Sequence, residues 1–388
     1  MKTIRAIVYE REKQFGPGLY RILGLELWEC AAAALGAVDG GGAFCVRPDT
    51  APARDISGLL EALNASGEDG VLLLPDDKCA VSKQTLENLC SAYAQNGVFA
   101  AVPAGDICVF SHAEAAALTG KRGGFADISD FTAALKNTLR GQTVPCARAE
   151  DELTANTLPS LARAARALRL SANEYHMERG VMLVDPENTY ISPGARIGAG
   201  SVIYPGVYLE GRTQIGAGCV IGPNCRIADS SVGDYAEITF SVLKESSVGA
   251  RAAVGPFAYM RPNSHVGERC KIGDFVEIKN SVIGDGTKVP HLTYVGDSDV
   301  GGGVNFGCGS VTVNYDGVKK RRTTVGDNAF IGCNTNLVAP VTVGAGAYTA
   351  AGSTITRDVP PGALAVARER QTNKEGWVEK SGLKKPQS

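Results

Sequence analysis

The sequence predicts two regions of different fold class: an α/β domain, followed by a parallel β-helix of hexapeptide repeats. Strand-like and helix-like segments alternate before residue 156, and aliphatic residues recur every six positions after residue 180. Glycine makes up 47 of the 388 residues, about 12% where roughly 7% is usual. The expected boundaries are 1–156 for the α/β domain, 157–179 for a linker helix, 180–360 for the β-helix and 361–388 for a C-terminal tail.

The composition excludes several classes of protein. Lys and Arg number 39 against 41 Asp and Glu, a net charge of −2, so nothing indicates binding to nucleic acid. The N-terminus has no apolar signal region and no stretch approaches eighteen apolar residues, so we expect no membrane segment. The eleven cysteines include no CxxC pair, which favours reduced thiols in a cytoplasmic protein and disfavours a zinc site.

The α/β prediction depends on the order of apolar segments. Helices are expected at 25–38 and 82–95, and the alternation with strands is typical of a mostly parallel sheet. A further helical pattern follows from Leu158 to Met177, with Leu161 and Leu168 on one face, and we interpret it as the linker helix. The expected strands are 4–9, 70–75, 97–103, 107–110 and 143–149.

The six-residue period predicts three short strands per coil. Glycine often follows the repeated aliphatic residue, as in Ile197-Gly198, Val254-Gly255 and Val343-Gly344, which suits a corner of positive φ. Cys219, Cys225 and Cys270 each stand two positions before a repeat aliphatic, so we expect them to point inward. The repeat comprises Ile191, Ile197, Ile203, Leu209, Ile215, Ile221 and Ile227; Val248, Val254, Met260, Val266, Ile272 and Ile278; and Val325, Ile331, Leu337, Val343, Thr349 and Ile355.

Two departures from the repeat indicate a functional site. The rhythm fails between Gly309 and Val325, where the chain inserts a loop. Separations near 18, such as the 18 residues from Arg261 to Lys279, stack side chains on successive coils about 5 Å apart. Polar candidates at such intervals are Arg261, Glu277, Lys279, His291, Tyr294 and Asn305.

The residue types in this group suggest their chemistry. Arg261 and Lys279 suit a phosphate or carboxylate, and His291 is a candidate general base that Glu277 would orient. The tyrosine and the asparagine can hydrogen-bond sugar hydroxyls. Spacing alone leaves two other interpretations open, namely a structural histidine and solvated surface charges.

Longer motifs in residues 250–377 resemble one family. The region is similar to the acetyltransferase domain of the bifunctional enzymes that combine UDP-N-acetylglucosamine pyrophosphorylase with glucosamine-1-phosphate N-acetyltransferase. The matching motifs are GPFAYMRP (255–262), GDFVEIKNS (273–281), HLTYVGD (291–297), NYDG (314–317), LVAPVTVG (337–344) and QTNKEGW (371–377).

The resemblance implies a left-handed β-helix, a homotrimer with shared active sites, and a cytoplasmic role in UDP-N-acetylglucosamine and peptidoglycan synthesis. It implies acetyl-CoA as cosubstrate, glucosamine 1-phosphate as acceptor, and no metal for acetyl transfer. The residues that match the family's site are His291 and Glu277 for catalysis; Arg261, Lys279, Tyr294, Asn305, Asn314 and Tyr315 for the acceptor; and Cys308, Cys333, Ala351 and Arg368 for acetyl-CoA.

Both regions depart from the family at particular positions. Cys308 and Cys333 stand where the family usually has small Ala and Ser, so we expect tuned coenzyme binding. In the N-terminal half, the family's Gly-rich phosphate loop is replaced by residues 9–24, which contain no Gly-Thr-Arg. Asp77 and Asn156 are weak candidate metal ligands, and Mg²⁺ is not expected.

The sequence therefore predicts an acetyltransferase joined to a degenerate nucleotidyltransferase-like domain that lacks uridylyltransferase activity. Three alternatives stay open. They are a bifunctional enzyme that keeps its pyrophosphorylase activity, an acetyltransferase for another amino sugar such as a nucleotide-linked one, and a non-catalytic trimer that binds sugar phosphates.

Overall fold

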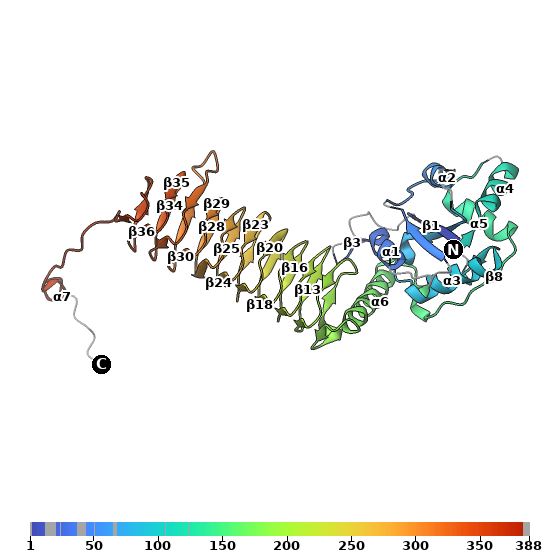
Figure 1. Ribbon diagram of the computed structural model, residues 1–388, viewed down its shortest axis with the longest axis horizontal. Helices are drawn as coiled ribbons and strands as arrows, with labels where there is room; N and C mark the ends of the chain where they lie inside the picture. The colour runs from blue at the N-terminus through green and yellow to red at the C-terminus, as the bar shows by residue number, and fades with distance from the viewer. Residues whose placement is uncertain are drawn as a thin grey trace. The chain divides into compact units, whose positions relative to one another are not determined.

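The computed structural model describes most of the chain, and residues outside the following ranges are not discussed. The chain divides into two compact units, Met1–Met260 and Arg261–Ser388, and each is described by itself (Figure 1). The described residues are 2–11, 21–23, 25–36, 44–49, 51–64, 68–104, 106–122 and 124–382.

A six-stranded sheet forms the centre of the α/β region, in the order β4-β1-β5-β7-β6-β8. β1 pairs in parallel with β4 and β5, whereas β7 is antiparallel to both of its neighbours. The prediction of a mostly parallel sheet is therefore right for one half, and β7 makes the other half mixed. The strands are β1 Lys2–Tyr9, β4 Phe44–Pro48, β5 Gly70–Pro75, β6 Ala100–Ala101, β7 Cys108–Phe110 and β8 Gln142–Thr143, with a separate antiparallel pair, β2 Arg21–Ile22 and β3 Leu25–Glu26.

Each face of this sheet has its own apolar core, because side chains alternate along a strand. In β1, Ile4, Ala6 and Val8 join one buried cluster, while Ile7 and Tyr9 join the other. The first cluster includes residues of α1 and α3, and the second includes residues of α2, α4 and α5. The helices are α1 Leu27–Gly36, α2 Ile56–Asn64, α3 Lys83–Asn96, α4 His112–Arg122 and α5 Ile128–Thr138, with 3₁₀ turns at Asp76–Lys78, Ala149–Glu152 and Pro186–Asn188.

The predicted linker helix is α6, Leu158–Met177, which has the expected bounds. Thr157 caps its first turn, since the hydroxyl accepts a hydrogen bond from the Ser160 N–H. Near its C-terminal end, buried Asn173 donates hydrogen bonds to the carbonyls of Pro186 (2.7 Å) and Thr189 (3.0 Å). The helix is thereby tied to the first coil of the β-helix.

The repeats of the first unit form a parallel β-solenoid with three sheets, named sheet A, sheet B and sheet C. Ile191 pairs with Leu209 and Ile203 with Ile221, both 18 residues apart, as the six-residue period predicts. Sheet A contains β10 Tyr190–Ile191, β13 Tyr208–Glu210, β16 Arg226–Ala228, β19 Val242–Lys244 and β22 Tyr259–Met260; sheet B contains β11 Arg196–Ile197, β14 Gln214–Ile215, β17 Ser231–Val232 and β20 Ser246–Val248; sheet C contains β9 Met182–Leu183, β12 Val202–Ile203, β15 Val220–Ile221, β18 Glu237–Ile238 and β21 Ala253–Val254.

The second unit is built from the same three kinds of strand and ends in the short helix α7, Trp377–Lys380. Its sheet A contains β25 Glu277–Lys279, β28 Tyr294–Gly296, β31 Val311–Val313, β34 Asn336–Val338 and β37 Thr354–Ile355; its sheet B contains β23 Ser264–Val266, β26 Val282–Ile283, β29 Ser298–Val300, β32 Thr323–Val325 and β35 Val341–Val343; its sheet C contains β24 Lys271–Asp274, β27 Lys288–His291, β30 Asn305–Phe306, β33 Phe330–Ile331, β36 Tyr348–Thr349 and β38 Leu364–Ala365.

The residues of the predicted repeat line the interior of the solenoid. All of them are buried except Ile197, which is partly exposed in a groove at the C-terminal end of α6. Cys219, Cys225 and Cys270 are buried as predicted, and the Cys270 thiol lies 3.1 Å from the Gly284 carbonyl. These cysteines therefore fill inward positions that suit small side chains.

The prediction for the glycines needs correction. Gly198 and Gly344, which directly follow a repeat aliphatic, do not have positive φ, whereas Gly200 does, at 77°. Gly198 is needed for close approach instead, because a Cβ there would lie 2.5 Å from the Ala217 nitrogen of the next coil. Only Gly255 of the three quoted examples has positive φ, at 108°.

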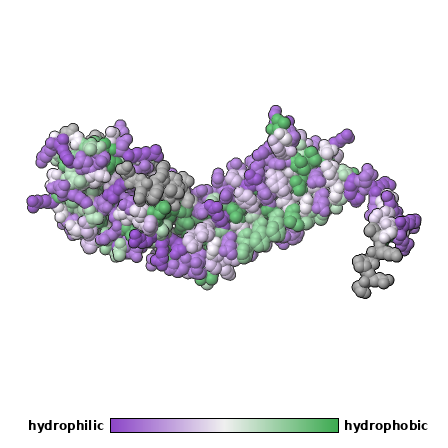
Figure 2. All heavy atoms as spheres, turned by 180° about the vertical axis from the view of Figure 1, so that it is seen from behind, coloured by the Kyte–Doolittle hydropathy of each residue, from purple (hydrophilic) through white to green (hydrophobic). Residues whose placement is uncertain are grey.

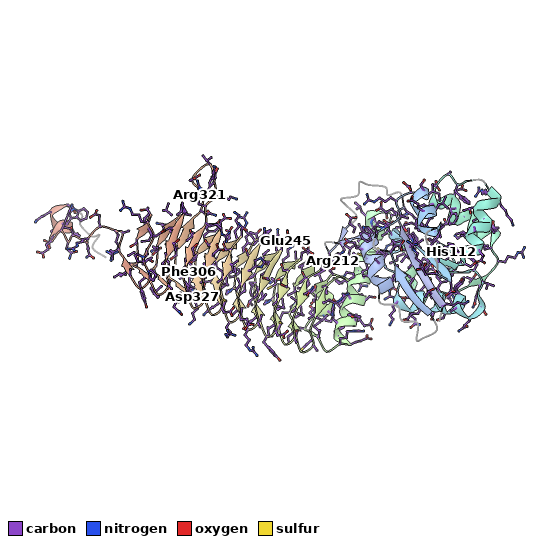
Figure 3. All side chains as sticks on the ribbon, turned by 45° about the horizontal axis from the view of Figure 1, so that its top comes forward. His112, Arg212, Glu245, Phe306, Arg321 and Asp327 are labelled. Atoms are coloured by element: carbon purple, nitrogen blue, oxygen red, sulfur yellow. The ribbon has the colours of Figure 1, made fainter. Side chains whose placement is uncertain are left out.

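The insertion projects from the second unit as a hairpin. Asn314 to Arg321 form its arms, with a bridge between Tyr315 and Lys320 and a hydrogen bond from the Arg321 N–H to the Asn314 carbonyl (2.8 Å). Figure 3 shows Arg321 on this projecting loop. The break in the repeat therefore does mark a loop outside the solenoid.

Apolar side chains also lie on the surface, as the space-filling view shows (Figure 2). In the second unit, Phe275 is 58% exposed and Leu292 is 56% exposed, and both have positive φ at solenoid corners. None of the described helices is long and apolar enough to cross a membrane.

Asn173→Ala is expected to lower the free energy of unfolding by about 2–4 kcal/mol, since it leaves two carbonyls of the first coil without a donor. Urea unfolding followed by circular dichroism measures the change. Glu174→Ala, at an exposed neighbouring position of α6, is the control and should change stability by less than about 0.5 kcal/mol. Equal stabilities of the two variants would show that the Asn173 amide does not hold the coil.

Candidate functional site

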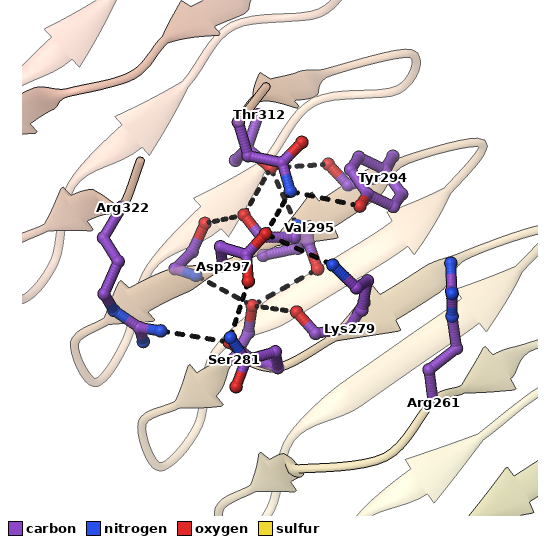
Figure 4. Close-up of polar contacts among 12 residues, drawn as sticks. Arg261, Lys279, Ser281, Tyr294, Val295, Asp297, Thr312 and Arg322 are labelled. Atoms are coloured by element: carbon purple, nitrogen blue, oxygen red, sulfur yellow. Dashed lines mark hydrogen bonds and ion pairs between the residues drawn. The ribbon is translucent and has the colours of Figure 1, made fainter. Parts of the chain in front are cut away.

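Asp297 is the centre of the polar network in the second unit (Figure 4). Its carboxylate accepts hydrogen bonds from Asn280 Nδ2 (2.6 Å) and Asn314 Nδ2 (2.5 Å), and Lys279 Nζ lies 3.3 Å away. The Asp297 side chain is only 6% exposed, so these partners supply the interactions that water would otherwise provide. Asp297 therefore connects Lys279, on a strand of sheet A, to Asn314, the first residue of the inserted hairpin.

The protonation of Asp297 follows from the same contacts. Burial by itself would raise the pKa of Asp297, but the hydrogen bonds from Asn280 and Asn314 and the charge of Lys279 outweigh it and hold this pKa below its ordinary value. The carboxylate is therefore ionised at neutral pH and keeps Lys279 in place.

The position of Tyr294 depends on a glycine. Tyr294 Oη accepts a hydrogen bond from Asn314 Nδ2 (3.3 Å). A Cβ at Gly296 would lie 2.3 Å from this hydroxyl oxygen, so any other residue there would displace the tyrosine. The hairpin is also held at its far end, because Arg322 Nε donates to Asp299 Oδ2 (2.8 Å).

Three cationic side chains, Arg261, Lys279 and Lys320, lie near Asp297. Arg261 Nη1 lies 3.0 Å from Glu277 Oε1, and Lys279 contacts Asp297 as described. The pKa of Lys320, on the hairpin, is lowered by a hydrogen bond with Lys279 and by the positive charges of Lys279 and Arg261. Lys320 thus lies beside Lys279 and within reach of the charge of Arg261, and such a group of cations suits an anion of more than one charge.

His291 contacts a carboxylate, but not the one predicted. Its Nδ1 lies 2.5 Å from Asp274 Oδ1, whereas Glu277 pairs with Arg261. Within the chain, the expectation that Glu277 orients the imidazole is therefore corrected. The hydrogen bond with His291 is the largest cause that lowers the pKa of Asp274, so that carboxyl group is ionised and suited to accept a hydrogen bond from Nδ1–H.

The predicted acetyl-CoA residues follow one corner of the solenoid. Cys308 and Cys333 occupy equivalent turns of adjacent coils, since the Asn334 N–H donates to the Cys308 carbonyl (2.8 Å). The Gly352 N–H in turn donates to the Cys333 carbonyl (2.8 Å), which places Ala351 in the next turn. A Cβ at Gly352 would lie 3.6 Å from Arg368 Cδ, so Arg368 borders the same corner.

Two predicted site residues belong neither to the polar network around Asp297 nor to the corner of the predicted acetyl-CoA residues. Asn305 lies in sheet C, paired with Lys288 and Phe330, while Glu277 and Tyr294 lie in sheet A. Tyr315 is 56% exposed and its hydroxyl bonds only locally, to the Gly317 carbonyl (2.7 Å). One chain alone therefore does not surround a ligand with all the predicted residues.

The candidate metal residues of the α/β region are arranged around an arginine. The Asp77 carboxylate lies 3.4 Å from Arg11 Nη1, and the same guanidinium nitrogen lies 3.4 Å from Asp106. The Asp77 carbonyl accepts a hydrogen bond from the Ala155 N–H, which brings Asn156 close along the backbone. No group of three His, Cys, Asp or Glu side chains in the described residues is arranged to hold a metal. In this structure the positive charge beside Asp77 and Asp106 is that of Arg11.

Most of the replaced phosphate loop, residues 12–20 and Gly24, lies outside the described residues. The same is true of the tail from residue 383. The predictions made for these segments therefore stay predictions.

Sequence reasoning missed three residues of the site. Asp297 follows Lys279 by 18 positions and Asp274 precedes His291 by 17, so coil spacing contained a signal for both. Lys320 stands in the inserted hairpin, where no repeat spacing applies. Its place beside Lys279 appears only in the structure.

The fold and the repeats define the class of the C-terminal region: it is a solenoid of transferase-type hexapeptide repeats. The sequence model "Bacterial transferase hexapeptide (six repeats)" matches residues 194–229 and 322–357. The prediction of an α/β region followed by a left-handed parallel β-helix of such repeats is confirmed.

Curated relatives confirm the resemblance to the bifunctional enzymes. A protein of Clostridium novyi (strain NT) named "Bifunctional protein GlmU" is 59% identical over 230 residues, which cover 59% of this chain and 50% of the relative. The protein of the same name from Clostridium acetobutylicum is 54% identical over 236 residues, 61% of this chain and 52% of the relative. Each match is longer than the 156 residues expected for the α/β domain, so it extends into the solenoid. The chain spans about half the length of these relatives.

One solved structure with partial similarity is a mutant of perosamine N-acetyltransferase from Caulobacter crescentus in complex with CoA and GDP-perosamine. It is 27% identical, with a TM-score of 0.27, and the match covers 31% of this chain and 53% of that chain.

Alkylation of the folded chain with iodoacetamide is expected to label Cys333, which is exposed, and more slowly Cys308, which is half-buried. Cys219, Cys225 and Cys270 should remain unlabelled because they are buried in the solenoid. Mass-spectrometric peptide mapping measures the pattern, and the same reaction in guanidinium chloride serves as the control in which all five react. Labelling of Cys219 under native conditions would contradict the inward placement.

Proposed function

We propose that the second unit transfers the acetyl group of acetyl-CoA to the amine of glucosamine 1-phosphate. The observation that supports this most directly is the combination of a histidine whose Nε2 is not used by its carboxylate partner with three cations beside the next strand. A pure binding site for a sugar phosphate needs the cations but has no use for a base.

The cations account for recognition of the acceptor. Arg261, Lys279 and Lys320 face one another and can share the oxygens of a phosphate dianion. Asn314 and Tyr294 border the same network and offer an amide and a hydroxyl to the sugar. We place this acceptor in UDP-N-acetylglucosamine and peptidoglycan synthesis, as the sequence resemblance implies.

The reaction needs two proton transfers, one away from the amine and one to the leaving thiolate. His291 Nε2 accepts a proton from the amine as its nitrogen forms a bond to the thioester carbonyl carbon. Backbone N–H groups of the solenoid stabilise the oxyanion, after which the C–S bond breaks and the thiolate of coenzyme A takes up a proton. No metal enters this step, and the protein contributes mainly by positioning the two substrates.

The corner formed by Cys308, Cys333, Ala351 and Arg368 is the proposed place of acetyl-CoA. Its small side chains leave room along the turns, and Arg368 supplies positive charge at the end of the row. Coenzyme A should accordingly slow alkylation of Cys308 and Cys333 without affecting the buried thiols.

A homotrimer with shared sites is the assembly we propose. Asn305 lies in a different sheet from Tyr294, and a second solenoid packed against the corner would bring an Asn305 face to the Tyr294 face of its neighbour. Exposed apolar residues at the corners, Phe275 and Leu292, supply surface for such packing.

For the α/β region we propose a scaffold or ligand-sensing role without uridylyltransferase activity, in the cytoplasm. The ion pair between Arg11 and Asp77 supports this, because the guanidinium already balances the carboxylate charge that a metal ion would need. The alternatives are retained pyrophosphorylase activity, which UTP-dependent release of pyrophosphate would reveal, and acetylation of another amino sugar, which a panel of acceptors would reveal.

His291→Ala is expected to lower kcat for acetyl transfer by roughly 100-fold or more with little change in KM for the acceptor, since the base acts in the transition state. Release of coenzyme A thiol, followed with a chromogenic disulfide, measures the rate. His265→Ala, at an exposed histidine of sheet B, is the control. An unmodified chain that releases no thiol with any amino sugar would overturn the proposed function. A fully active His291→Ala variant would contradict only the assignment of His291 as the general base and would leave the proposed acetyl transfer standing.

Arg261→Ala and Lys279→Ala are expected to raise KM for glucosamine 1-phosphate by roughly 10- to 100-fold, the effect of losing one charged hydrogen bond to phosphate. Free glucosamine should be a poor substrate of the unmodified chain for the same reason. Arg269→Ala, at an exposed turn whose arginine pairs with Glu268, is the control and should keep the KM. Equal reaction of glucosamine and its 1-phosphate would contradict the phosphate assignment.

A further inference from the structure

The strands that carry His291 and its partner are longer than their neighbours. β24 and β27 have four residues each, whereas the other described strands of the second unit have two or three. The extra length adds one more register pair at the end of the strands, Asp274 with His291. In-register side chains of parallel strands lie side by side about 4.8 Å apart, so this extension is what places the two groups together.

A glycine permits the extension. Gly273 stands directly before Asp274, and a Cβ there would lie 1.8 Å from the Pro290 carbonyl oxygen of the adjacent strand. The Leu292 N–H then donates to the Asp274 carbonyl (2.9 Å), which fixes the backbone on both sides of the pair. The local backbone therefore holds Asp274 and His291 in register on adjacent strands.

The contact itself determines which nitrogen is free. Asp274 Oδ1 lies 2.5 Å from His291 Nδ1, so the ionised carboxylate accepts a hydrogen bond from Nδ1–H, and Nε2 keeps its lone pair. The charge of Lys271 on β24 also acts on Asp274, and Lys288 is the register partner of Lys271 on β27. Glu277 on β25 pairs with Arg261 instead. Among the described residues, Asp274 is the one carboxylate in contact with the imidazole.

We infer that Asp274 is the positioning residue of the base: it holds the imidazole of His291 with Nε2 toward the acceptor amine and stabilises the imidazolium that forms during transfer. This inference rests on the proposed function and assigns to Asp274 the role that the resemblance assigned to Glu277. Asp274 touches neither substrate; it acts through His291. The proton moves from the amine to Nε2, and none moves to Asp274.

Asp274→Asn is expected to lower kcat by about 10- to 100-fold and to leave KM for glucosamine 1-phosphate unchanged. The effect should be smaller than the roughly 10⁴-fold loss in a buried Ser-His-Asp triad, because His291 and Asp274 are 53% and 36% exposed. Loss of the neighbouring negative charge disfavours the imidazolium, so the acid limb of the pH–rate profile should move to lower pH. Asp274→Glu should restore part of the rate.

Asp285→Asn is the matched control, since Asp285 is a carboxylate of a turn in the same unit that accepts a hydrogen bond from the Glu268 N–H and faces neither group of the site. It should keep kcat and the pH profile. Thermal unfolding of both variants establishes that each remains folded.

A spectroscopic readout separates this inference from the proposed function. In ¹⁵N-histidine-labelled protein, the signals of His291 are identified among the four histidines with a His291→Gln variant. Asp274→Asn should change the Nδ1 and Nε2 shifts of His291, while Glu277→Gln should leave them in place. Shifts that respond to Glu277→Gln but not to Asp274→Asn would overturn the inference whether or not the protein transfers acetyl groups. Unaltered kcat in Asp274→Asn, in a chain that is active, would overturn it as well.

Discussion

Adjacent coils of a parallel β-solenoid lie about 4.8 Å apart, and this spacing determines where the candidate site residues on the strands of the second unit stand. A coil of about 18 residues converts sequence separations into neighbours, so that Glu277 meets Tyr294 and Asp274 meets His291. The aliphatic residues of the repeat fix the register, since a slip by one residue would turn the interior outward. The apolar interior thus positions the polar surface, and the site needs little further support from its own residues.

The support that the site does have comes from one buried charge. Asp297 is removed from water and is satisfied by the consecutive residues Lys279 and Asn280 and by Asn314 of the inserted hairpin. A buried carboxylate without such partners would be strongly destabilising, so the need to satisfy it holds the hairpin against the solenoid. A buried carboxylate in this way holds the side chains of Asn314 and Lys279 in fixed positions beside each other.

Much of this architecture followed from the sequence, because a six-residue period depends only on which side chains enter the interior. The inward direction of Cys219 and Cys270 was predicted correctly for that reason, and the bounds of α6 followed from its own helical apolar pattern. The partner of His291 was not, because choosing between Asp274 and Glu277 requires knowing that β24 and β27 extend by a further pair. Lys320 was missed since an insertion has no repeat, and β7 was not recognised as antiparallel because periodicity does not give strand direction.

The charges of the site suggest why an anionic acceptor would be drawn there. Lys279 and Arg261 already have carboxylate partners, whereas Lys320 faces their positive charges and its pKa is lowered in consequence. A phosphate dianion placed among the three would relieve this repulsion and restore the ordinary proton affinity of Lys320. Glu277 and Asp297 meanwhile hold the other two cations in position through their ion pairs.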